Sequence, residues 1–562
     1  MFSRRISFFL FLLLGAQILL TPPRARANVL LPALFSDNMV LQQGDSGANV
    51  WGTADPKENV TVNIGGKSAS AVADDDGKWR VQLSGLRPGG PFQMTVAGKN
   101  QITIQNVAVG EVWLCAGASN MDWKVVSSAN AEKEIADANH AMIRMFTVDQ
   151  KVGNRPLSDC GGKWEVCDPQ TVRLFSAVAY FFGRDLHQKI LAPIGLIEAS
   201  WPASPIRAWV PKSAFMGNEE LSIALDDWRA HAKNHDAEKA AYDQQIAAWK
   251  TEADQARAEG RLLPRRPYDP HEILSPFSPI RIFNGMIAPL IPYSIKGAIW
   301  YQGEANTQTP TMYRKFFSAL ITSWRKEWGA GDFPFLFVQL PNYLPHRDEP
   351  GESSWAELRE AQAAALALPK TGMAVTIDIG EERDMHPKNK QDVGHRLALI
   401  AEATVYGKTD VVYSGPVFSE MNTVKNNVSL SFKQPDGGLV DRNGPPLKGF
   451  AIAGEDRRFF WADAKIERNG KVTLHSDRVP NPVAVRYAWA DSPDCDLANK
   501  AGLPAPPFRT DDWEPPRAPA ANSSATPAPA SGAESAATGA PEASASAAAS
   551  PQISAPATSP SP

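Results

Sequence analysis

Two kinds of apolar pattern follow one another along this chain. Between residues 28 and 108, and again after residue 409, apolar and polar residues alternate in short segments such as 60–64 (VTVNI). Turn clusters such as 74–77 (DDDG) separate these segments. Period-two alternation is typical of strands with one buried face, and frequent turns between such strands favour a β-sandwich. We therefore expect a β-sandwich domain over 28–108 and a C-terminal β domain over 409–513.

The region 109–408 has a different pattern, in which buried strands alternate with amphipathic helices. In 177–190 and 311–327 apolar residues recur three or four positions apart, which predicts helices. Strands separated by helices are joined by crossover connections and therefore lie parallel. The expected fold class is α/β, with a three-layer parallel-sheet domain flanked by the two β domains. Strands are expected over 109–114, 194–198, 295–299, 335–340 and 374–379, and further helices over 354–366 and 394–406.

A helical insertion is predicted at 215–270. Within it, residues 218–259 carry an apolar stripe at helical spacing, which indicates one long helix or a helical hairpin that packs on the central domain. Binding of a partner or a cofactor is the alternative role for this stripe. His231 and His235 stand four positions apart, but without a nearby acidic third ligand they indicate helix surface rather than a metal site.

The stretch 109–123 (VGEVWLCAGASNMDW) joins a buried strand to an abrupt run of small and polar residues. A serine after small residues leaves room for a carbonyl group to approach, and the N–H groups of a following helix can stabilise an oxyanion. Ser119 is therefore the candidate nucleophile. A serine at this place is also an ordinary helix cap, so the stretch alone leaves both interpretations open.

Two further motifs follow predicted strands, namely WYQGEAN at 300–306 and DMHP at 384–387. Together with GASNM at 117–121, they resemble the sialate O-acetylesterase family of carbohydrate esterases, which belongs to the SGNH hydrolase class. The resemblance extends over roughly 35–406, and three motifs in the same order are more specific than one. It implies an SGNH-like catalytic domain over 109–408 that hydrolyses acetyl esters of carbohydrates, with no metal and no cofactor.

Ester hydrolysis by a serine requires a base and a group that orients this base. His386 is the predicted base because it follows a buried strand in a polar loop, whereas His395 lies inside a predicted helix and is expected to be structural. The family motif supplies Asp384 as the orienting carboxylate. Glu304 competes for this role, because some related esterases use that glutamate. Asp378, at the end of a predicted strand, is a third candidate with loop structure as its alternative role.

The oxyanion of the reaction needs hydrogen-bond donors. The candidates are the backbone N–H groups of Ser119 and Ala203 and the side-chain amides of Gln302 and Asn306; a helix cap is the alternative role for Asn306. In the related family a Gly-Gly pair usually stands where this chain has Pro202 and Ala203. Ala203 keeps its N–H group but Pro202 has none, so the sequence does not decide whether this segment contributes a donor to the oxyanion hole.

The N-terminus has the pattern of a cleavable secretory signal over 1–27. Two arginines precede an apolar run at 6–20, and a small-x-small site ends at Ala27. A membrane anchor is the alternative, but the run is shorter than the roughly 20 residues that span a bilayer. We therefore expect an exported protein, periplasmic or secreted, with no membrane span after cleavage.

The cysteines add one structural expectation. In an exported protein Cys160 and Cys167, separated by a short loop, are the expected disulfide. Cys115 lies in a buried strand and is expected to be an inert core thiol. The chain has four cysteines in all, which suggests no zinc site.

Composition and charge narrow the function further. The net charge of -4 provides no basic excess to neutralise phosphates, which argues against nucleic acid. Residues 514–562 are nearly all Ala, Pro, Ser, Thr and Gly, which predicts a disordered tail or linker.

From the motifs and the predicted signal together we expect an exported serine esterase that removes O-acetyl groups from carbohydrates, above all from sialic acids. Acetylated xylan or another polysaccharide is the alternative substrate. Two alternatives belong to other classes: a non-catalytic carbohydrate-binding protein with a decayed hydrolase core, which the Pro202-Ala203 departure suggests, and a peptidase with the same triad.

Overall fold

The computed structural model describes residues 28–233, 235–259, 264, 267, 276–433 and 437–514. The predicted signal segment 1–27 and the predicted tail beyond residue 514 lie outside these residues. Within the described ranges, no helix combines the length and the apolar character needed to cross a membrane. The described residues up to Asp512 belong to one compact unit, and the domain boundaries expected inside it stay predictions.

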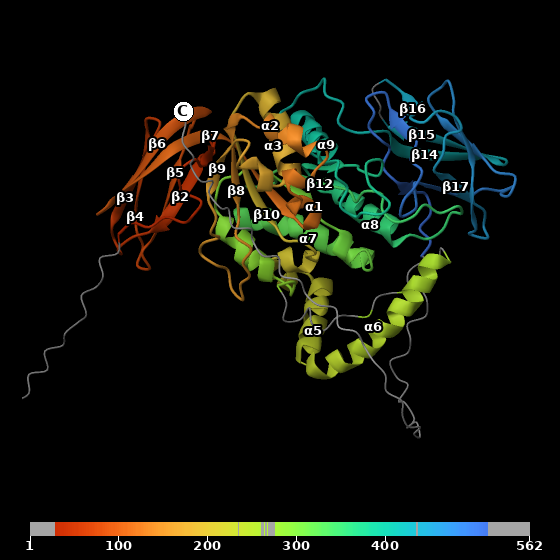
Figure 1. Ribbon diagram of the computed structural model, residues 1–562, viewed down its shortest axis with the longest axis horizontal. Coiled ribbons are helices and arrows are strands. Elements are labelled where there is room, and N and C mark those ends of the chain that lie inside the picture. Colours follow the sequence, from red (N-terminus) through yellow and green to blue (C-terminus); the bar gives the residue numbers. More distant parts are fainter. Residues whose placement is uncertain are drawn as a thin grey trace, which may run out of the picture. The chain divides into compact units, whose positions relative to one another are not determined.

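A largely parallel sheet with the strand order β13-β12-β11-β7-β10-β8-β9 forms the centre of this unit (Figure 1). Neighbouring strands are parallel except β8 and β9, which are antiparallel. The expected mixed α/β class with a central parallel sheet is therefore confirmed. The strands are β7 (Gln101–Gly117), β8 (His140–Thr147), β9 (Trp164–Cys167), β10 (Ile194–Ser200), β11 (Gly297–Tyr301), β12 (Phe335–Val338) and β13 (Thr371–Ala374).

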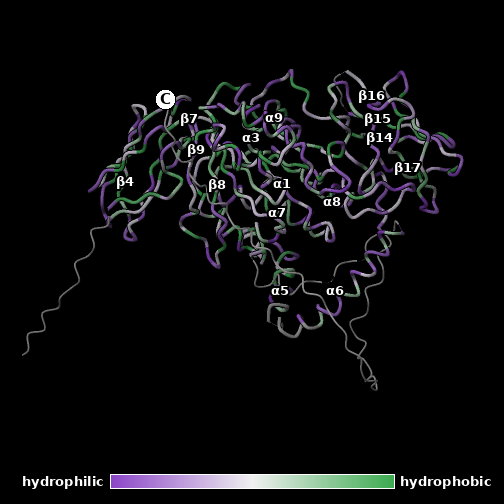
Figure 2. The backbone as a smooth tube through the Cα atoms, in the orientation of Figure 1, coloured by the Kyte–Doolittle hydropathy of each residue, from purple (hydrophilic) through white to green (hydrophobic). Residues whose placement is uncertain are grey.

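Both faces of this sheet are buried, as parallel sheets require. Successive residues of β7 enter two different cores, because Leu114 lies in one and Trp113 in the other. Helices α7 and α8 contribute to the core of Leu114, and α3 and α9 contribute to the core of Trp113. Figure 2 shows hydrophobic residues along the strands between them. The helices are α3 (Ala177–Ile190), α7 (Pro310–Trp328), α8 (Ser354–Ala363) and α9 (Lys390–Thr404).

The long strand β7 also joins the central sheet to the N-terminal strands. Its first half pairs antiparallel with β6, and its second half pairs parallel with β10 and β11. The predicted strand 60–64 lies within β3, which pairs with β4 and β6. A separate antiparallel pair is formed by β2 and β5. The N-terminal strands are β1 (Val40–Gln42), β2 (Ala48–Thr53), β3 (Asn59–Ile64), β4 (Lys67–Val72), β5 (Lys78–Leu83) and β6 (Gly89–Ala97).

Residues after α9 form small antiparallel sheets around a third core. Their strand orders are β14-β15-β20-β19, β18-β17-β21-β23 and β16-β22. The strands are β14 (Val417–Val424), β15 (Asn427–Lys433), β16 (Leu439–Asp441), β17 (Phe450–Ala453), β18 (Phe459–Trp461), β19 (Asp463–Ile466), β20 (Val472–His475), β21 (Ala484–Tyr487), β22 (Leu497–Asn499) and β23 (Phe508–Arg509).

The predicted helical insertion contains two helices, α5 (Glu219–Lys233) and α6 (His235–Ala258). Leu221 and Leu225 of α5 lie in the same core as α7, which supports local packing of the apolar stripe. The side chains of His231 and His235 lie outside the described residues, as does most of the predicted insertion after residue 259.

The strand predicted at 374–379 is displaced in the structure. Strand β13 ends at Ala374, and the chain then leaves the sheet. Ile377 packs in the third core, and the buried carboxylate of Asp378 binds Arg396 and Arg442. Residues of this apolar run therefore pack in two different cores. Hydrophobicity alone does not predict which core each residue joins.

The predicted disulfide is wrong, because all four cysteines are free thiols. Cys160 lies in the core of Leu114, whereas Cys167 lies in the core of Trp113, where its thiol donates to the carbonyl of Ala138. The two sulfur atoms therefore face different cores. Burial raises the pKa of both thiols to about 12, which makes them unreactive.

Candidate active site

Ser119 follows the carboxyl end of β7 and begins the short helix α1 (Ser119–Asp122). Gly117 adopts φ +151°, and a Cβ atom there would lie 2.1 Å from the carbonyl oxygen of Tyr301, so this close approach of β7 and β11 requires glycine. The N-cap position belongs to Ala118, and no side chain caps the helix. The helix-cap interpretation of Ser119 is therefore wrong, and its hydroxyl is free for another role.

The hydroxyl of Ser119 is held by the loop that follows β10. The backbone N–H of Ala203 donates to Ser119 Oγ at 2.9 Å. Ala203 reaches this position with φ +58°, a left-handed conformation that glycine adopts without strain. The structure thus brings together Ser119 and Ala203, which lie 84 positions apart in the sequence.

His386 and Asp384 form a second pair in the loop before α9. His386 Nδ1 lies 3.4 Å from Asp384 Oδ1, and the backbone N–H of His386 donates to the same oxygen at 2.8 Å. The imidazole stacks on the indole of Trp123, with ring centroids 5.4 Å apart and an angle of 12° between the planes. In the part of the chain that the structure describes, no hydrogen bond joins Ser119 Oγ to the imidazole. Such contacts often tighten only when substrate binds.

The buried side chain of Asn120 connects these loops. Its Nδ2 donates to Glu304 Oε1 at 2.6 Å and to the carbonyl of Met385 at 2.9 Å. Its Oδ1 accepts a hydrogen bond from Lys390 Nζ. Glu304 therefore contacts the residue after Ser119 rather than His386, which makes Asp384 the carboxylate beside the imidazole.

Gln302 and Asn306 differ in the donors that they leave free. Gln302 is fully buried, and its Nε2 donates to the carbonyl of Ser204 at 3.0 Å and to Asn306 Oδ1 at 2.9 Å. Gln302 therefore lacks the free donor that an oxyanion would need. Asn306 Oδ1 also accepts from the N–H of Ile206, and Thr309 rather than Asn306 occupies the N-cap position of α7. Its Nδ2 atom forms no hydrogen bond within the described residues, so Asn306 stays a candidate donor.

Comparison with known proteins identifies the family. A family model described as carbohydrate esterase, sialic acid-specific acetylesterase, matches residues 283–402, which include Glu304, Asp384 and His386. Sialate O-acetylesterase of Rattus norvegicus is 30% identical over 526 residues, which cover 85% of this chain and 93% of the relative. The chain belongs to the sialate O-acetylesterase family. It is therefore a carbohydrate esterase, as the three sequence motifs predicted.

Two further relatives agree with this assignment. The sialate O-acetylesterase of Homo sapiens is 28% identical over 520 residues, covering 84% of this chain and 91% of the relative. A solved structure, described as a novel carbohydrate acetylesterase from Xanthomonas citri, is 36% identical with a TM-score of 0.73. The match covers 86% of this chain and all of that chain. The family thus implies an acetylated carbohydrate as the substrate.

A charged cluster holds α1 against the end of β10. The carboxylate of Glu198 is buried and lies 2.9 Å from Lys124 Nζ, while the hydroxyl of Ser200 donates to Asp122 and Glu198. Burial raises the pKa of Glu198 despite the opposing effect of the lysine. These bonds fix the helical turn that carries Ser119.

Lys390 is another buried ionisable residue at the site. Its side chain is fully buried, and burial lowers its pKa to about 7, although the charges of Glu304, Asp384 and Glu381 act in the opposite direction. Sequence analysis did not single out Lys390 or Asn120. Asn120 lies inside the GASNM motif and Lys390 lies shortly after the DMHP motif, and these positions were the only available signal.

The remaining sequence candidates have partners other than Ser119 and His386. His395 Nδ1 lies 2.9 Å from a carboxylate oxygen of Asp185, which agrees with the expected structural role. Asp378 pairs with arginines rather than with His386. Among the described residues, no group of three or more His, Cys, Asp or Glu side chains is arranged to hold a metal ion.

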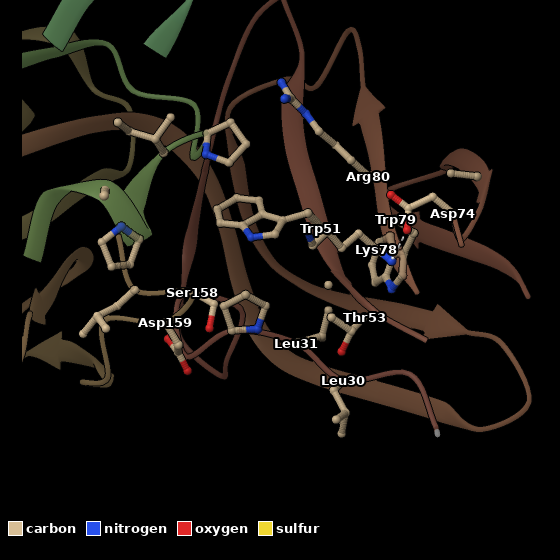
Figure 3. Close-up of a pocket in the computed structure, with 18 of the residues that line it drawn as sticks. Leu30, Leu31, Trp51, Thr53, Asp74, Lys78, Trp79, Arg80, Ser158 and Asp159 are labelled. Carbon is tan, nitrogen blue, oxygen red and sulfur yellow. Dashed lines mark hydrogen bonds between the residues drawn. The ribbon is translucent and has the colours of Figure 1, made fainter. Parts of the chain in front are cut away.

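A crevice of about 720 Å³ opens in another part of the molecule (Figure 3). Trp51 and Arg80 line it from β2 and β5, and Pro292 lines it from the segment before β11. Ser119 follows the carboxyl end of β7 and Glu304 follows that of β11, whereas Pro292 precedes β11. The lining contains no predicted site residue, so we do not assign this crevice to the reaction.

Proposed function

We propose that this chain is an exported serine esterase of the SGNH type that removes O-acetyl groups from sialic acids. Ser119 is the nucleophile, His386 is the base and Asp384 orients the base. The family supports the acetylesterase activity. The observation that carries the assignment of the nucleophile is the 2.9 Å hydrogen bond from the Ala203 N–H to Ser119 Oγ, because it places a backbone donor beside the attacking atom.

Attack begins when Ser119 Oγ bonds to the acetyl carbonyl carbon and its proton passes to His386 Nε2. The carbonyl π electrons move to oxygen, and the N–H groups of Ala203 and Ser119 stabilise this oxyanion. The Ser119 N–H is available because the first N–H groups of a helix have no partner inside it. The Nδ2 group of Asn306 is a further donor of the proposed oxyanion hole.

Collapse of the tetrahedral intermediate breaks the bond between the acetyl carbon and the sugar oxygen. His386 returns the proton to that oxygen, which releases the free sugar hydroxyl and leaves an acetyl-Ser119 ester. Water then attacks the ester while His386 takes one of its protons. The second collapse restores the Ser119 hydroxyl and releases acetate.

Asp384 completes the proposed triad by holding Nδ1 of His386 protonated. The distance of 3.4 Å is longer than a charge-assisted hydrogen bond, which usually measures about 2.7–2.9 Å. The imidazolium that forms in the transition state strengthens this interaction, because only then does the pair carry opposite charges.

Two observations bear on the substrate and the location. Pro202 and Ala203 are exposed beside Ser119, so the proposed nucleophile lies at an accessible surface that suits a bulky carbohydrate. The predicted signal at 1–27 supports export, although these residues lie outside the described structure.

The test is acetate release from purified protein lacking residues 1–27, with O-acetylated sialic acid and acetylated xylan compared side by side. We expect the larger kcat/KM on the sialic acid and loss of at least about a thousandfold in Ser119→Ala. A larger kcat/KM on acetylated xylan would identify acetylated plant polysaccharides as the preferred substrate. Equal rates for wild type and Ser119→Ala would reject the proposed nucleophile.

A further inference from the structure

The side chain of Asn120 is the point where three segments of the proposed site meet. Its amide hydrogens go to Glu304, after β11, and to the carbonyl of Met385, next to His386. Its oxygen accepts from Lys390, the first residue of α9. All three contacts are more than 180 positions away in the sequence, so Asn120 fixes the Ser119 turn relative to both other loops.

The orientation of this amide follows from its partners. A lysine Nζ faces Asn120 as a donor, while a carboxylate and a backbone carbonyl accept hydrogen bonds. The amide must therefore turn its oxygen to Lys390 and its nitrogen to Glu304 and Met385. If the lysine donor is removed, one constraint on the amide is lost and its oxygen is left buried without a partner, which favours rearrangement.

Lys390 occupies a place that is electrostatically unfavourable for a lysine. Its side chain is fully buried, and it opens a helix at the end where the helix dipole disfavours a cation. The aromatic rings of Tyr301 and Trp123, whose centroids lie 5.5 and 5.6 Å from Nζ, offset part of this cost. Trp123 is also the ring on which His386 stacks. The Lys390 amine thus contacts both the residue after Ser119 and the ring on which His386 stacks.

We propose that Lys390 is a positioning residue for the esterase, which acts through Asn120 to hold the Ser119, Glu304 and His386 loops in register. This inference rests on the proposed roles of Ser119 and His386. Lys390 touches neither the substrate nor the reacting atoms. Its loss should therefore lower kcat by misplacing the hydroxyl and the imidazole, and it should leave KM nearly unchanged.

The experiment is a double-mutant cycle with Lys390→Met and Asn120→Ala, assayed with 4-nitrophenyl acetate. We expect each single variant to lower kcat by about 10- to 100-fold, since small misplacements of reacting groups have effects of this size. KM should stay within about twofold, and the double variant should be no worse than Asn120→Ala, because both changes remove one interaction. Lys388→Met is the matched control, since Lys388 is exposed two positions away, and it should keep wild-type kcat.

Losses that multiply in the double variant would overturn the proposal, as would a wild-type kcat in folded Lys390→Met. Circular dichroism and the melting temperature check folding. Lys390→Gln retains a donor for Asn120 Oδ1 without the buried charge, so it should keep kcat closer to the wild-type value than Asn120→Ala does. If Lys390→Met does not fold, a kcat in folded Lys390→Gln as low as that of Asn120→Ala would overturn the proposal. Ser119→Ala separates the two hypotheses. Activity that survives in Ser119→Ala rejects the proposed function, whereas its loss together with additive effects rejects the role of Lys390 alone.

Discussion

Replacing Asp384 with asparagine tests which carboxylate orients the base. In the folded protein Asp384 Oδ1 lies beside His386 Nδ1, whereas Glu304 accepts from Asn120. An asparagine amide at position 384 can donate to Nδ1, which stabilises the imidazole tautomer with its proton on Nε2. That tautomer cannot take the proton of Ser119, so kcat should fall although the two side chains have the same shape.

The size of the loss follows from the charge interaction in the transition state. Two opposite unit charges 3.4 Å apart attract by about 5 kcal/mol at an effective dielectric constant near 20, and by about 2.4 kcal/mol near 40. The side chain of Asp384 is 39% exposed, so solvent screening favours the smaller value. Because about 1.4 kcal/mol corresponds to a tenfold change in rate, we expect kcat to fall by about 50-fold.

Glu304→Gln is the matched comparison. A glutamine oxygen can still accept from Asn120, so kcat should fall by less than about tenfold. Both variants are assayed for kcat and KM on 4-nitrophenyl acetate between pH 6 and pH 9, with folding checked by circular dichroism. A larger loss in Glu304→Gln than in Asp384→Asn would refute the assignment and make Glu304 the orienting carboxylate.

Three further predictions concern stability. Ala203→Gly keeps the N–H donor and relieves a left-handed alanine, so it should raise the free energy of unfolding by up to about 1 kcal/mol with kcat unchanged; a lower melting temperature would contradict this. Burial lowers the pKa of Lys390 to about 7, so between pH 7 and pH 10 the unfolded chain binds more protons than the folded protein. The free energy of unfolding of the wild type relative to Lys390→Met should therefore rise by up to about 1.4 kcal/mol per pH unit. A difference in melting curves that does not change with pH would oppose this prediction. Burial acts to raise the pKa of Asp378, but the hydrogen bonds and charges of Arg396 and Arg442 together outweigh this effect and lower the pKa. Asp378→Asn should therefore destabilise the protein by about 3 kcal/mol at pH 7 and by progressively less below pH 4, as measured by thermal unfolding.

The central fold was predictable because its signals are local. The helix at 177–190 and the one at 311–327 agree with α3 and α7 to within a residue at each end, since each has an apolar stripe long enough to define its period. The strand expected at 374–379 was misplaced because its apolar residues pack in a neighbouring core. The disulfide failed for a related reason, since a short loop in sequence can connect two faces of a sheet.

The proposed site was only partly predictable, because some of its contacts join segments that are distant in the sequence. Ser119 and His386 stand out because each follows a strand in a polar loop, and the end of a parallel strand is a usual place for such residues. The amide of Gln302 was misjudged, because one of its two acceptors, the carbonyl of Ser204, comes from the loop after β10 and the other is Asn306 Oδ1. Asn120 and Lys390 act through contacts between distant segments, and a single sequence carries no record of those contacts.

The Pro202-Ala203 pair motivated the alternative of a decayed, carbohydrate-binding protein, and the geometry removes that motive. The donor beside Ser119 is the N–H of Ala203, so the missing N–H of Pro202 takes nothing from the proposed oxyanion hole. The left-handed conformation of Ala203 costs about 1–2 kcal/mol, which is less than the roughly 3–4 kcal/mol that one oxyanion donor can contribute to catalysis. The departure from the glycine pair therefore lowers the folding stability but keeps the donor in place, which is consistent with a working esterase.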